Sequence, residues 1–339
     1  FIAFTALING LESTKNHTLN RDLQVERIQI IQLGAQLLGT ISTIAWALVD
    51  PSLWALIAGV MITGTSRLVL GHLYLRGPIN RFSWDPSAAR ALFRYGRWVF
   101  LGTCLSFLAE QSDRLVFGKL ISLETLGVYA IAVIIASLPF SGLAQLSWKI
   151  LFPYFSRLRE GAKAFSESFV RIRTPVFVLG GWALSGLIAA GPSAVRLLYD
   201  ERYHGAGWMV QILSVAMWFQ LMGVTNDAAA WGRGRPQLAS IASLGKLVAL
   251  AIFIPVGFYL GAKVGPNAAF PGAVVGIACA DITRYLVSFA TCTTLGLRPW
   301  RQDGTMTALV LTIGAFGAWL ELSLRNAGLQ ALLVAPILF

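Results

Sequence analysis

The amino-acid sequence predicts an all-α fold, a polytopic bundle of transmembrane helices. The first observation is the composition: of 339 residues, 56% are hydrophobic and only 13% are charged, whereas charged residues make up about 25% of an average soluble domain. The second is that apolar stretches of about 20 residues, the length that crosses a bilayer as a helix, recur along the whole chain. These stretches are too long for buried strands.

Nine apolar segments are long enough to be complete spans, and one segment at each end of the chain is predicted to be a partial span. The complete spans are expected at about 28–48, 53–73, 96–116, 124–148, 174–192, 208–230, 237–261, 268–295 and 305–324, and the partial ones at 1–11 and 326–339. The longest connection is expected at about 149–173. No connection has the size of an extramembrane catalytic domain, so the sequence predicts a protein that is not an enzyme.

The basic residues predict the orientation in the membrane. The net charge is +11. If the segment 12–27 is cytoplasmic and the sides alternate, the cytoplasmic segments hold about three times as many Lys and Arg residues as the opposite side, as the positive-inside rule expects. Topology and contact with the lipids of a cell inner or plasma membrane therefore explain the charge, and nucleic-acid binding is the poorer interpretation. Three basic residues remain at membrane depth: Arg67, Lys246 and Arg284.

The chain is expected to divide into three parts. Residues 1–79 would form the end of an N-terminal lobe, 80–97 a cytoplasmic linker helix, and 98–339 a C-terminal lobe with the spans that follow it. Pro86 suits the first position of the linker helix. The segment 13–29 mixes charged and apolar residues and is predicted to form a short amphipathic helix on the cytoplasmic surface.

Lys246, Asp281 and Arg284 form the strongest candidate site. A charge inside a span costs free energy and usually faces a bundle interior or a water-filled cavity. Counted from the short loop that joins their two helices, all three lie roughly 20–24 Å along the helix, so one depth is expected. Two interpretations stay open. The residues form a neutralising pair that joins the helices, or a site whose surplus positive charge faces an anionic lipid headgroup, for which the planar fork of Arg is suited.

A second group of charged residues ends the span predicted at 96–116. Glu110, Asp113 and Arg114 recur at helical spacing, so they would line a cavity in the outer leaflet or form an interfacial helix end with a local ion pair. Arg67 lies inside its span and can extend toward the cytoplasm. Asp227 is interpreted as a helix-end residue. Taken together, the deep charges are expected to lean basic.

Proline and glycine positions predict where helices bend and pack closely. Pro139, Pro175 and Pro255 fall within predicted spans, where proline bends helices. Small residues at four-residue spacing indicate close packing of two helices. They are Gly257, Gly261 and Gly265, followed by Gly272 and Gly276.

Residues for metal, disulfide or nucleotide chemistry are scattered. The three cysteines and three histidines show no ligand spacing and no disulfide framework. The sequence has no glycine-rich phosphate loop. It therefore predicts no cofactor, no metal site and no hydrolysis of ATP by this chain.

Two segments resemble a known family. The run SDRLVFGKLISLETLGVYAIA at 112–132, followed by LFPYFSRLRE at 151–160, resembles the polysaccharide flippases of the multidrug/oligosaccharidyl-lipid/polysaccharide exporter superfamily. GRGRPQL at 232–238 resembles the entry to a later span in the same family. The positions that match the family's main pattern are Asp113, Gly118, Leu126, Gly127, Tyr129, Phe152, Pro153, Ser156, Arg157 and Leu158.

The resemblance implies a two-lobed exporter-type fold around a central cavity, with N-terminal helices missing from this chain. It also implies a transporter that flips a polyprenyl-diphosphate-linked oligosaccharide, a unit of O-antigen, capsule or exopolysaccharide, from the cytoplasmic to the outer leaflet by alternating access. The implied partners are the lipid-linked glycan and a glycan polymerase or glycosyltransferases.

Two alternatives stay open. The first is a cation-coupled drug exporter of the same superfamily, whose site should hold unpaired carboxylates. The second is a membrane enzyme or a non-transporting scaffold of a glycan-assembly complex. A scaffold should tolerate the loss of Lys246 and Arg284.

Overall fold

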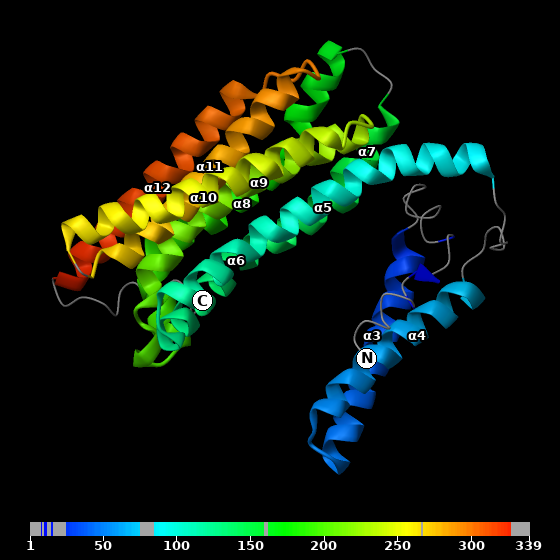
Figure 1. Cartoon of the computed structure of the whole chain (residues 1–339), viewed down its shortest axis with the longest axis horizontal. Helices are drawn as coiled ribbons and strands as arrows, with labels where there is room; N and C mark the ends of the chain where they lie inside the picture. The colour runs from blue at the N-terminus through cyan, green and yellow to red at the C-terminus, as the bar shows by residue number, and fades with distance from the viewer. Residues whose placement is uncertain are drawn as a thin grey trace. The chain divides into compact units, whose positions relative to one another are not determined.

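The computed structural model describes most of the chain as helices (Figure 1). The described residues are 25–74, 85–158, 162–265 and 267–326, together with Ile8, Gly10, Leu11 and Lys15. These ranges contain no strand, which confirms the predicted all-α class. The predicted partial spans at 1–11 and 326–339 and the amphipathic segment 13–29 lie largely outside the described residues.

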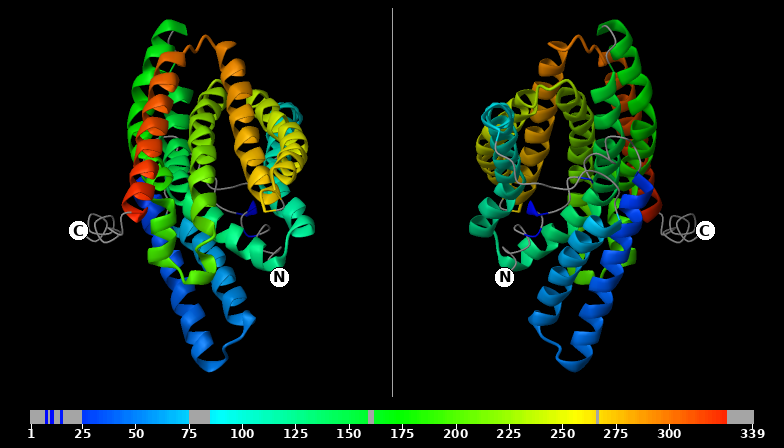
Figure 2. Two further views of the ribbon diagram at one scale, coloured as in Figure 1. Left: turned by 90° about the vertical axis from the view of Figure 1, so that its left-hand side faces the viewer. Right: turned by 90° about the vertical axis from the view of Figure 1, so that its right-hand side faces the viewer.

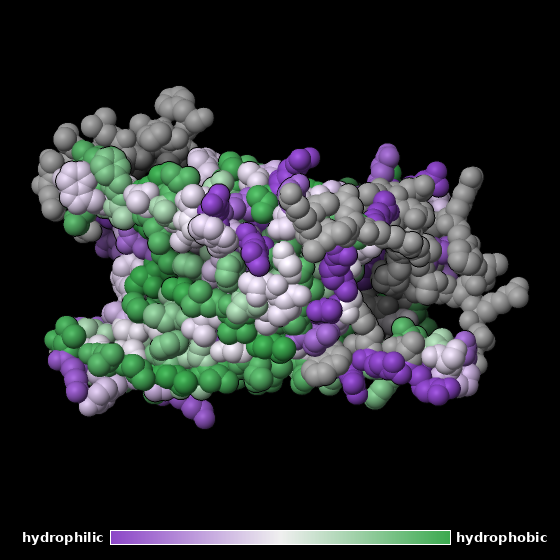
Figure 3. Space-filling model, turned by 90° about the horizontal axis from the view of Figure 1, so that it is seen from above, coloured by the Kyte–Doolittle hydropathy of each residue, from purple (hydrophilic) through white to green (hydrophobic). Residues whose placement is uncertain are grey.

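Eight helices have the length and composition to cross a membrane. They are Glu26–Val49, Leu53–Tyr74, Leu123–Arg157, Phe165–Leu198, Ala206–Gly232, Gln237–Val264, Ala269–Thr293 and Trp300–Leu324. Eight of the nine predicted complete spans coincide with them and are confirmed. Large apolar side chains such as Leu179, Trp182 and Ile252 are exposed on their outer faces, and apolar residues cover much of the surface seen in Figure 3. The protein is a multi-pass membrane protein.

The ninth predicted span, 96–116, lies within the 35-residue helix α5, Pro86–Leu120. Pro86 is its first residue, as the sequence predicts. Helix α5 is not among the eight helices that are apolar enough to span by composition, and charged residues lie near both ends of the predicted span: Arg94 and Arg97 at one end, Glu110, Asp113 and Arg114 at the other. It runs without a break from the predicted linker into the predicted span.

The chain separates into two compact units, Phe1–Pro86 and Ser87–Phe339. In the first unit, α3 (Val25–Val49) packs against α4 (Leu53–Tyr74). The contact is close and reciprocal: a Cβ on Gly39 would lie 1.8 Å from Thr63 Oγ1, and a Cβ on Gly59 would lie 1.8 Å from Thr43 Oγ1. Glycine at both positions therefore lets the two backbones approach.

The second unit is a bundle of long helices (Figure 2). After α5 come α6 (Leu123–Leu146), the π-helical turn η1 (Ser147–Leu151) and α7 (Phe152–Arg157), then α8 (Ala162–Leu198), the short 3₁₀ turn η2 (Glu201–Tyr203), α9 (Ala206–Gly232), α10 (Gln237–Val264), α11 (Ala269–Thr293) and α12 (Trp300–Asn326). Helix α9 lies at the centre and packs against α6, α8 and α11. The fully buried Trp218, Leu213 and Leu221 belong to it.

The connection expected at 149–173 is shorter than predicted, because the neighbouring candidate spans, Leu123–Arg157 and Phe165–Leu198, extend into that segment. Helix α7 continues to Arg157, and α8 begins at Ala162. In α8, Phe165 and Phe169 lie one helical turn apart and are both fully buried, so the charges around them belong to an amphipathic helix.

The predicted close packing of glycines between α10 and α11 is confirmed for Gly257, Gly261, Gly272 and Gly276, but not for Gly265, which follows the end of α10 and has open space around it. A Cβ on Gly257 would lie 2.2 Å from the carbonyl oxygen of Gly272, and a Cβ on Gly276 would lie 2.3 Å from that of Phe253. The backbones of the two helices are therefore in direct contact. The prolines singled out in the sequence lie inside α6, α8 and α10, as expected. A non-helical residue in α8, Ala190 (φ −114°, ψ 19°), precedes a further proline, Pro192.

Candidate functional site

Three neighbouring cavities lie within the second unit, along α5 and between it and α6, α9, α10 and α11. We call them outer, middle and inner after the membrane sides that the charge bias predicts, and their volumes are about 270, 50 and 360 Å³. The outer and middle cavities share Ala109, Glu110, Phe140, Gln220 and Lys246. The middle and inner cavities share Ser106, Glu110, Val224, Ser243 and Arg284. Because they share walls, the three form one polar seam along α5.

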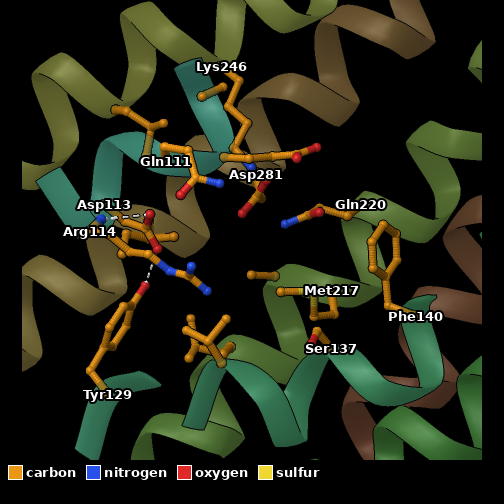
Figure 4. Close-up of a pocket in the computed structure, with 17 residues that line it drawn as sticks. Gln111, Asp113, Arg114, Tyr129, Ser137, Phe140, Met217, Gln220, Lys246 and Asp281 are labelled. Atoms are coloured by element: carbon orange, nitrogen blue, oxygen red, sulfur yellow. Dashed lines mark hydrogen bonds and ion pairs between the residues drawn. The ribbon is translucent and has the colours of Figure 1, made fainter. Parts of the chain in front are cut away.

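The outer cavity holds the second predicted group of charges (Figure 4). Tyr129 donates a hydrogen bond of 2.5 Å to Asp113 Oδ2, and Asp113 Oδ1 accepts the backbone N–H of Arg114 at 2.8 Å. The exposed Arg114 side chain points into the cavity, and its guanidinium makes no ion pair with any described residue. Arg114 is therefore a cation available to an anionic ligand.

The predicted equal depth of Lys246 and Asp281 is confirmed. Lys246 Nζ on α10 lies 2.6 Å from Asp281 Oδ1 on α11, and both side chains are buried. Lys246 borders the outer and middle cavities, and Asp281 borders the outer one. The pair joins α10 to α11, as a neutralising pair would. It also borders the seam, as a residue of a ligand site would, so both interpretations from the sequence apply in part.

The expected surplus of positive charge in this cluster is wrong, because Asp227 pairs with Arg284. Arg284 Nη2 donates to Asp227 Oδ2 at 2.5 Å, joining α11 to α9. Asp227 is buried, so the interpretation of it as a helix-end residue is also wrong. Asp227 lies five residues before the end of α9, which is typical of a helix-end residue. The sequence alone does not show that α11 packs against α9 at this point, so it could not predict the ion pair with Arg284.

Across the whole seam, carboxylates outnumber cations. The charged residues that line the three cavities are the carboxylates Glu110, Asp113, Asp227 and Asp281 and the cations Arg114, Lys246 and Arg284. The expectation that the deep charges lean basic therefore does not hold for this part of the chain. Glu110 borders all three cavities and makes no ion pair with a described residue.

Small hydroxyl residues bring α5 close to α10 beside the inner and middle cavities. The Ser106 and Ser243 hydroxyls share a hydrogen bond of 2.8 Å. A Cβ on Gly102 would lie 2.6 Å from Ser240 Oγ. The described part of this contact thus brings small side chains and a neutral hydrogen bond between two hydroxyls together.

Arg67 belongs to the first unit and is described with it alone. It lies on α4, half-buried, and lines a cavity of about 410 Å³ between α3 and α4 together with Gln36, Thr40, Thr43 and Thr63. The structure therefore places Arg67 at a polar cavity, whereas the other predicted site residues lie along the seam of the second unit.

Comparison with known proteins assigns the family. A family model described as polysaccharide biosynthesis protein matches residues 1–207. The chain belongs to this family. The resemblance found in the sequence is thereby confirmed at the family level, and no solved structure matches the chain.

The relatives are distant and longer. The lipopolysaccharide biosynthesis protein WzxC of Escherichia coli strain K12 is 21% identical over 272 residues, which cover 79% of this chain and 54% of the relative. The teichuronic acid biosynthesis protein TuaB of Bacillus subtilis strain 168 is 20% identical over 334 residues, 97% of this chain and 68% of the relative. The succinoglycan biosynthesis transport protein ExoT of Rhizobium meliloti strain 1021 is 21% identical over 198 residues. The chain thus spans about half the length of the first of these relatives.

Proposed function

We propose that this protein is a flippase for a lipid-linked oligosaccharide. It would move a polyprenyl-diphosphate-linked glycan unit, of the O-antigen, capsule or exopolysaccharide type, from the cytoplasmic to the outer leaflet by alternating access. The observation that carries the proposal is the polar seam, a row of three cavities lined by charged and hydroxyl groups inside an otherwise apolar bundle. The family assignment and the transport role named for ExoT support it.

The polar groups of the seam can replace the water that the headgroup loses when it crosses the membrane. A diphosphate and its sugars lose their water in the hydrocarbon core at a cost of many kcal/mol unless other polar groups replace it. Arg114 provides a planar guanidinium suited to two parallel hydrogen bonds with phosphate. The seam therefore replaces water along a path on which the lipid tail stays in the bilayer.

The two ion pairs make binding reversible. Asp281 and Asp227 neutralise Lys246 and Arg284 while no substrate is present. A phosphate would compete with these carboxylates. The free energy needed to break the existing pairs would weaken its net binding to the cations. The cations would regain their carboxylates when the substrate leaves, which favours release on the other side of the membrane.

Complementation tests this proposal. The full-length protein is expressed in a strain that lacks its own flippase, and surface glycan is measured for the wild type, Lys246→Ala, Asp281→Ala and Arg284→Ala, together with membrane abundance. Arg202→Ala serves as the control, because Arg202 is 65% exposed and pairs with Glu124 outside the seam. We expect export by the wild type and the control. Each seam variant leaves a buried charge without its partner and should lower membrane abundance, so export is compared per molecule of protein, and we expect it to be lost in all three. Normal export by all three seam variants would contradict the proposal.

Failure of the wild type to restore glycan, in hosts that make several different glycan units, would also contradict it. A non-transporting scaffold predicts this failure, because it cannot replace the missing flippase of the strain. Export by the wild type therefore separates transport from assembly.

One observation favours a second candidate, a cation-coupled exporter of the same superfamily. Glu110 borders all three cavities, and it makes no ion pair with a described residue. A carboxylate of this kind can bind a coupling cation or a cationic drug. This candidate predicts that the protein raises drug resistance in an efflux-deficient strain and that Glu110→Gln removes the resistance. No change in resistance would leave the flippase as the remaining transporter.

A further inference from the structure

The inner cavity has an aromatic wall made by two tryptophans from different helices. Trp148 and Trp231 both line the cavity, and their ring centroids lie 5.3 Å apart at an interplanar angle of 74°. Both side chains are half-buried. In the sequence, each fits an interfacial tryptophan near the end of a span, but the structure brings them together beside a cavity.

A local change in the helix places Trp148 in this wall. Trp148 lies in the π-helical turn η1, where the N–H of Phe152 bonds to the carbonyl of Ser147, five residues earlier. The next residue, Pro153, has no N–H to give to the carbonyl of Lys149, so the regular ladder is already interrupted there. Such turns occur often at functional sites, because they redirect side chains without ending the helix.

The rest of the inner cavity combines apolar side chains, among them Phe107 and Val224, with polar groups whose charges nearly balance. The Arg284–Asp227 pair and the hydroxyls of Ser106, Ser240 and Ser243 line it. Besides Glu110, these groups offer hydrogen-bond donors and acceptors without a free cation for phosphate. At about 360 Å³, the cavity has the size of small-molecule sites, which are roughly 300–1,000 Å³.

The indole nitrogen of Trp231 is buried and donates no hydrogen bond to any described group. An unsatisfied donor of this kind costs free energy. Packing alone therefore holds the Trp231 ring, and its N–H is left for a ligand in the cavity that Trp231 lines.

We propose that the inner cavity is a subsite for one uncharged sugar ring of the transported glycan. The C–H face of the ring packs against Trp148 or Trp231, as apolar faces do on large aromatic surfaces. The ring hydroxyls bond to the Asp227 carboxylate and to the serines. This inference rests on the proposed flippase function and deepens it, because sugar and diphosphate are bound at different places, with Arg114 at the outer cavity as the free cation.

A binding comparison tests the subsite. The full-length protein in detergent is titrated with bare polyprenyl diphosphate and with polyprenyl diphosphate that carries one N-acetylglucosamine. We expect the wild type to bind the sugar-bearing lipid about tenfold more tightly, a difference of about 1.4 kcal/mol. Trp148→Leu and Trp231→Leu should lose this preference and keep the affinity for the bare lipid. Trp182→Leu, at a position 77% exposed on α8, should keep the preference.

The outcomes separate the two proposals. Binding of the bare lipid without a preference for the sugar overturns the subsite alone, whereas no binding of either lipid overturns the flippase function as well. An unchanged preference in both leucine variants also overturns the subsite. A lipid that carries glucuronic acid should show a smaller preference, because Glu110 repels its carboxylate.

A second measurement needs no variant and so does not depend on whether the leucine variants fold. A photoreactive diazirine on the N-acyl group of the sugar is activated in the wild-type complex, and the labelled peptides are identified by mass spectrometry. Labels at or beside Trp148 or Trp231 support the subsite. Labels confined to other helices contradict it.

Discussion

Two groups of buried charges in the second unit use the same residue types in different surroundings. One is the packed cluster, in which Arg173 of α8 pairs with Asp303 of α12 and donates to Asn226 of α9 at 3.3 Å, while Tyr285 of α11 donates to Asp303 at 2.6 Å. The other consists of the seam pairs, Lys246–Asp281 and Arg284–Asp227. The packed cluster and the Arg284–Asp227 pair join helices that do not follow each other in the chain, whereas the Lys246–Asp281 pair joins the consecutive helices α10 and α11.

The difference lies in the space beside the charges. The Arg173 guanidinium is fully buried and lies between two rings, 4.5 Å from the centroid of Phe169 and 4.2 Å from that of Phe177. Side chains thus occupy both faces of its plane. Every member of the seam pairs borders a cavity. Charged residues inside a membrane bundle are therefore not all functional: those enclosed by side chains hold helices together, and those beside a cavity can meet a ligand.

The largest expected effect breaks the packed cluster. Arg173→Leu leaves Asp303 as a buried charge without its cation, and the loss of one partner of a buried pair costs about 3–5 kcal/mol. We expect membrane abundance and the thermal midpoint in detergent to fall sharply. Arg173→Leu combined with Asp303→Leu should recover much of the loss, because both charges are then removed. Normal abundance of the single variant would show that the cluster does not hold the bundle together.

The next effect concerns function. Lys246→Met combined with Asp281→Leu replaces a seam pair by apolar groups of similar size, which is often neutral for stability. We therefore expect abundance close to that of the wild type, together with a rate of glycan export at least about tenfold lower, equivalent to about 1.4 kcal/mol in the barrier. Export per molecule at the wild-type rate would show that this pair, like Arg173 and Asp303, only holds helices together.

A smaller effect is expected at the free cation. Arg114→Gln removes a charged hydrogen-bond donor, and hydrogen bonds to charged groups contribute about 1.5–3 kcal/mol. The affinity for bare polyprenyl diphosphate, measured by titration in detergent, should fall about tenfold or more. Arg114→Lys should retain part of the affinity, because it keeps the charge without the planar fork. Equal affinity of Arg114→Gln and the wild type would mean that phosphate binds elsewhere.

The smallest effect is expected at the contact between α5 and α10. Ser106→Ala removes one neutral hydrogen bond to Ser243, which contributes about 1 kcal/mol. We expect unchanged abundance and a small decrease of the thermal midpoint, and the double variant with Ser243→Ala should lie close to the single one. A decrease as large as that of Arg173→Leu would show that α5 is held much more strongly than this contact indicates.

The sequence was sufficient to predict where most of the spanning helices lie, because the length of an apolar segment can be read from neighbouring residues alone. It also predicted that Lys246 and Asp281 would lie at one depth, since both are counted from the same short loop. The sequence did not predict that Arg173 is buried, because Arg173 lies among other charged residues in the expected connection at 149–173. In the structure it belongs to α8 and is fully buried in the bundle. The sequence failed for Asp227 because its partner is on α11, and only tertiary packing brings the two together.

The sequence could not predict the inner cavity either, because its walls come from different helices that meet only through tertiary packing. Trp148 and Trp231 each have the signature of an interfacial aromatic residue. Their contact depends on the π-helical turn and on the packing of α9 beside it. A local pattern predicts neither of these features.

The most direct test compares the two groups of charges in one experiment. Export of the lipid-linked glycan is measured per molecule of protein for two double variants, Lys246→Met/Asp281→Leu and Arg173→Leu/Asp303→Leu, each corrected for membrane abundance. We predict that the seam variant is abundant and inactive, whereas the packed-cluster variant exports at a rate close to the wild type for every molecule that folds. The opposite result, an active seam variant and an inactive packed-cluster variant, would contradict the assignment of the site to the seam.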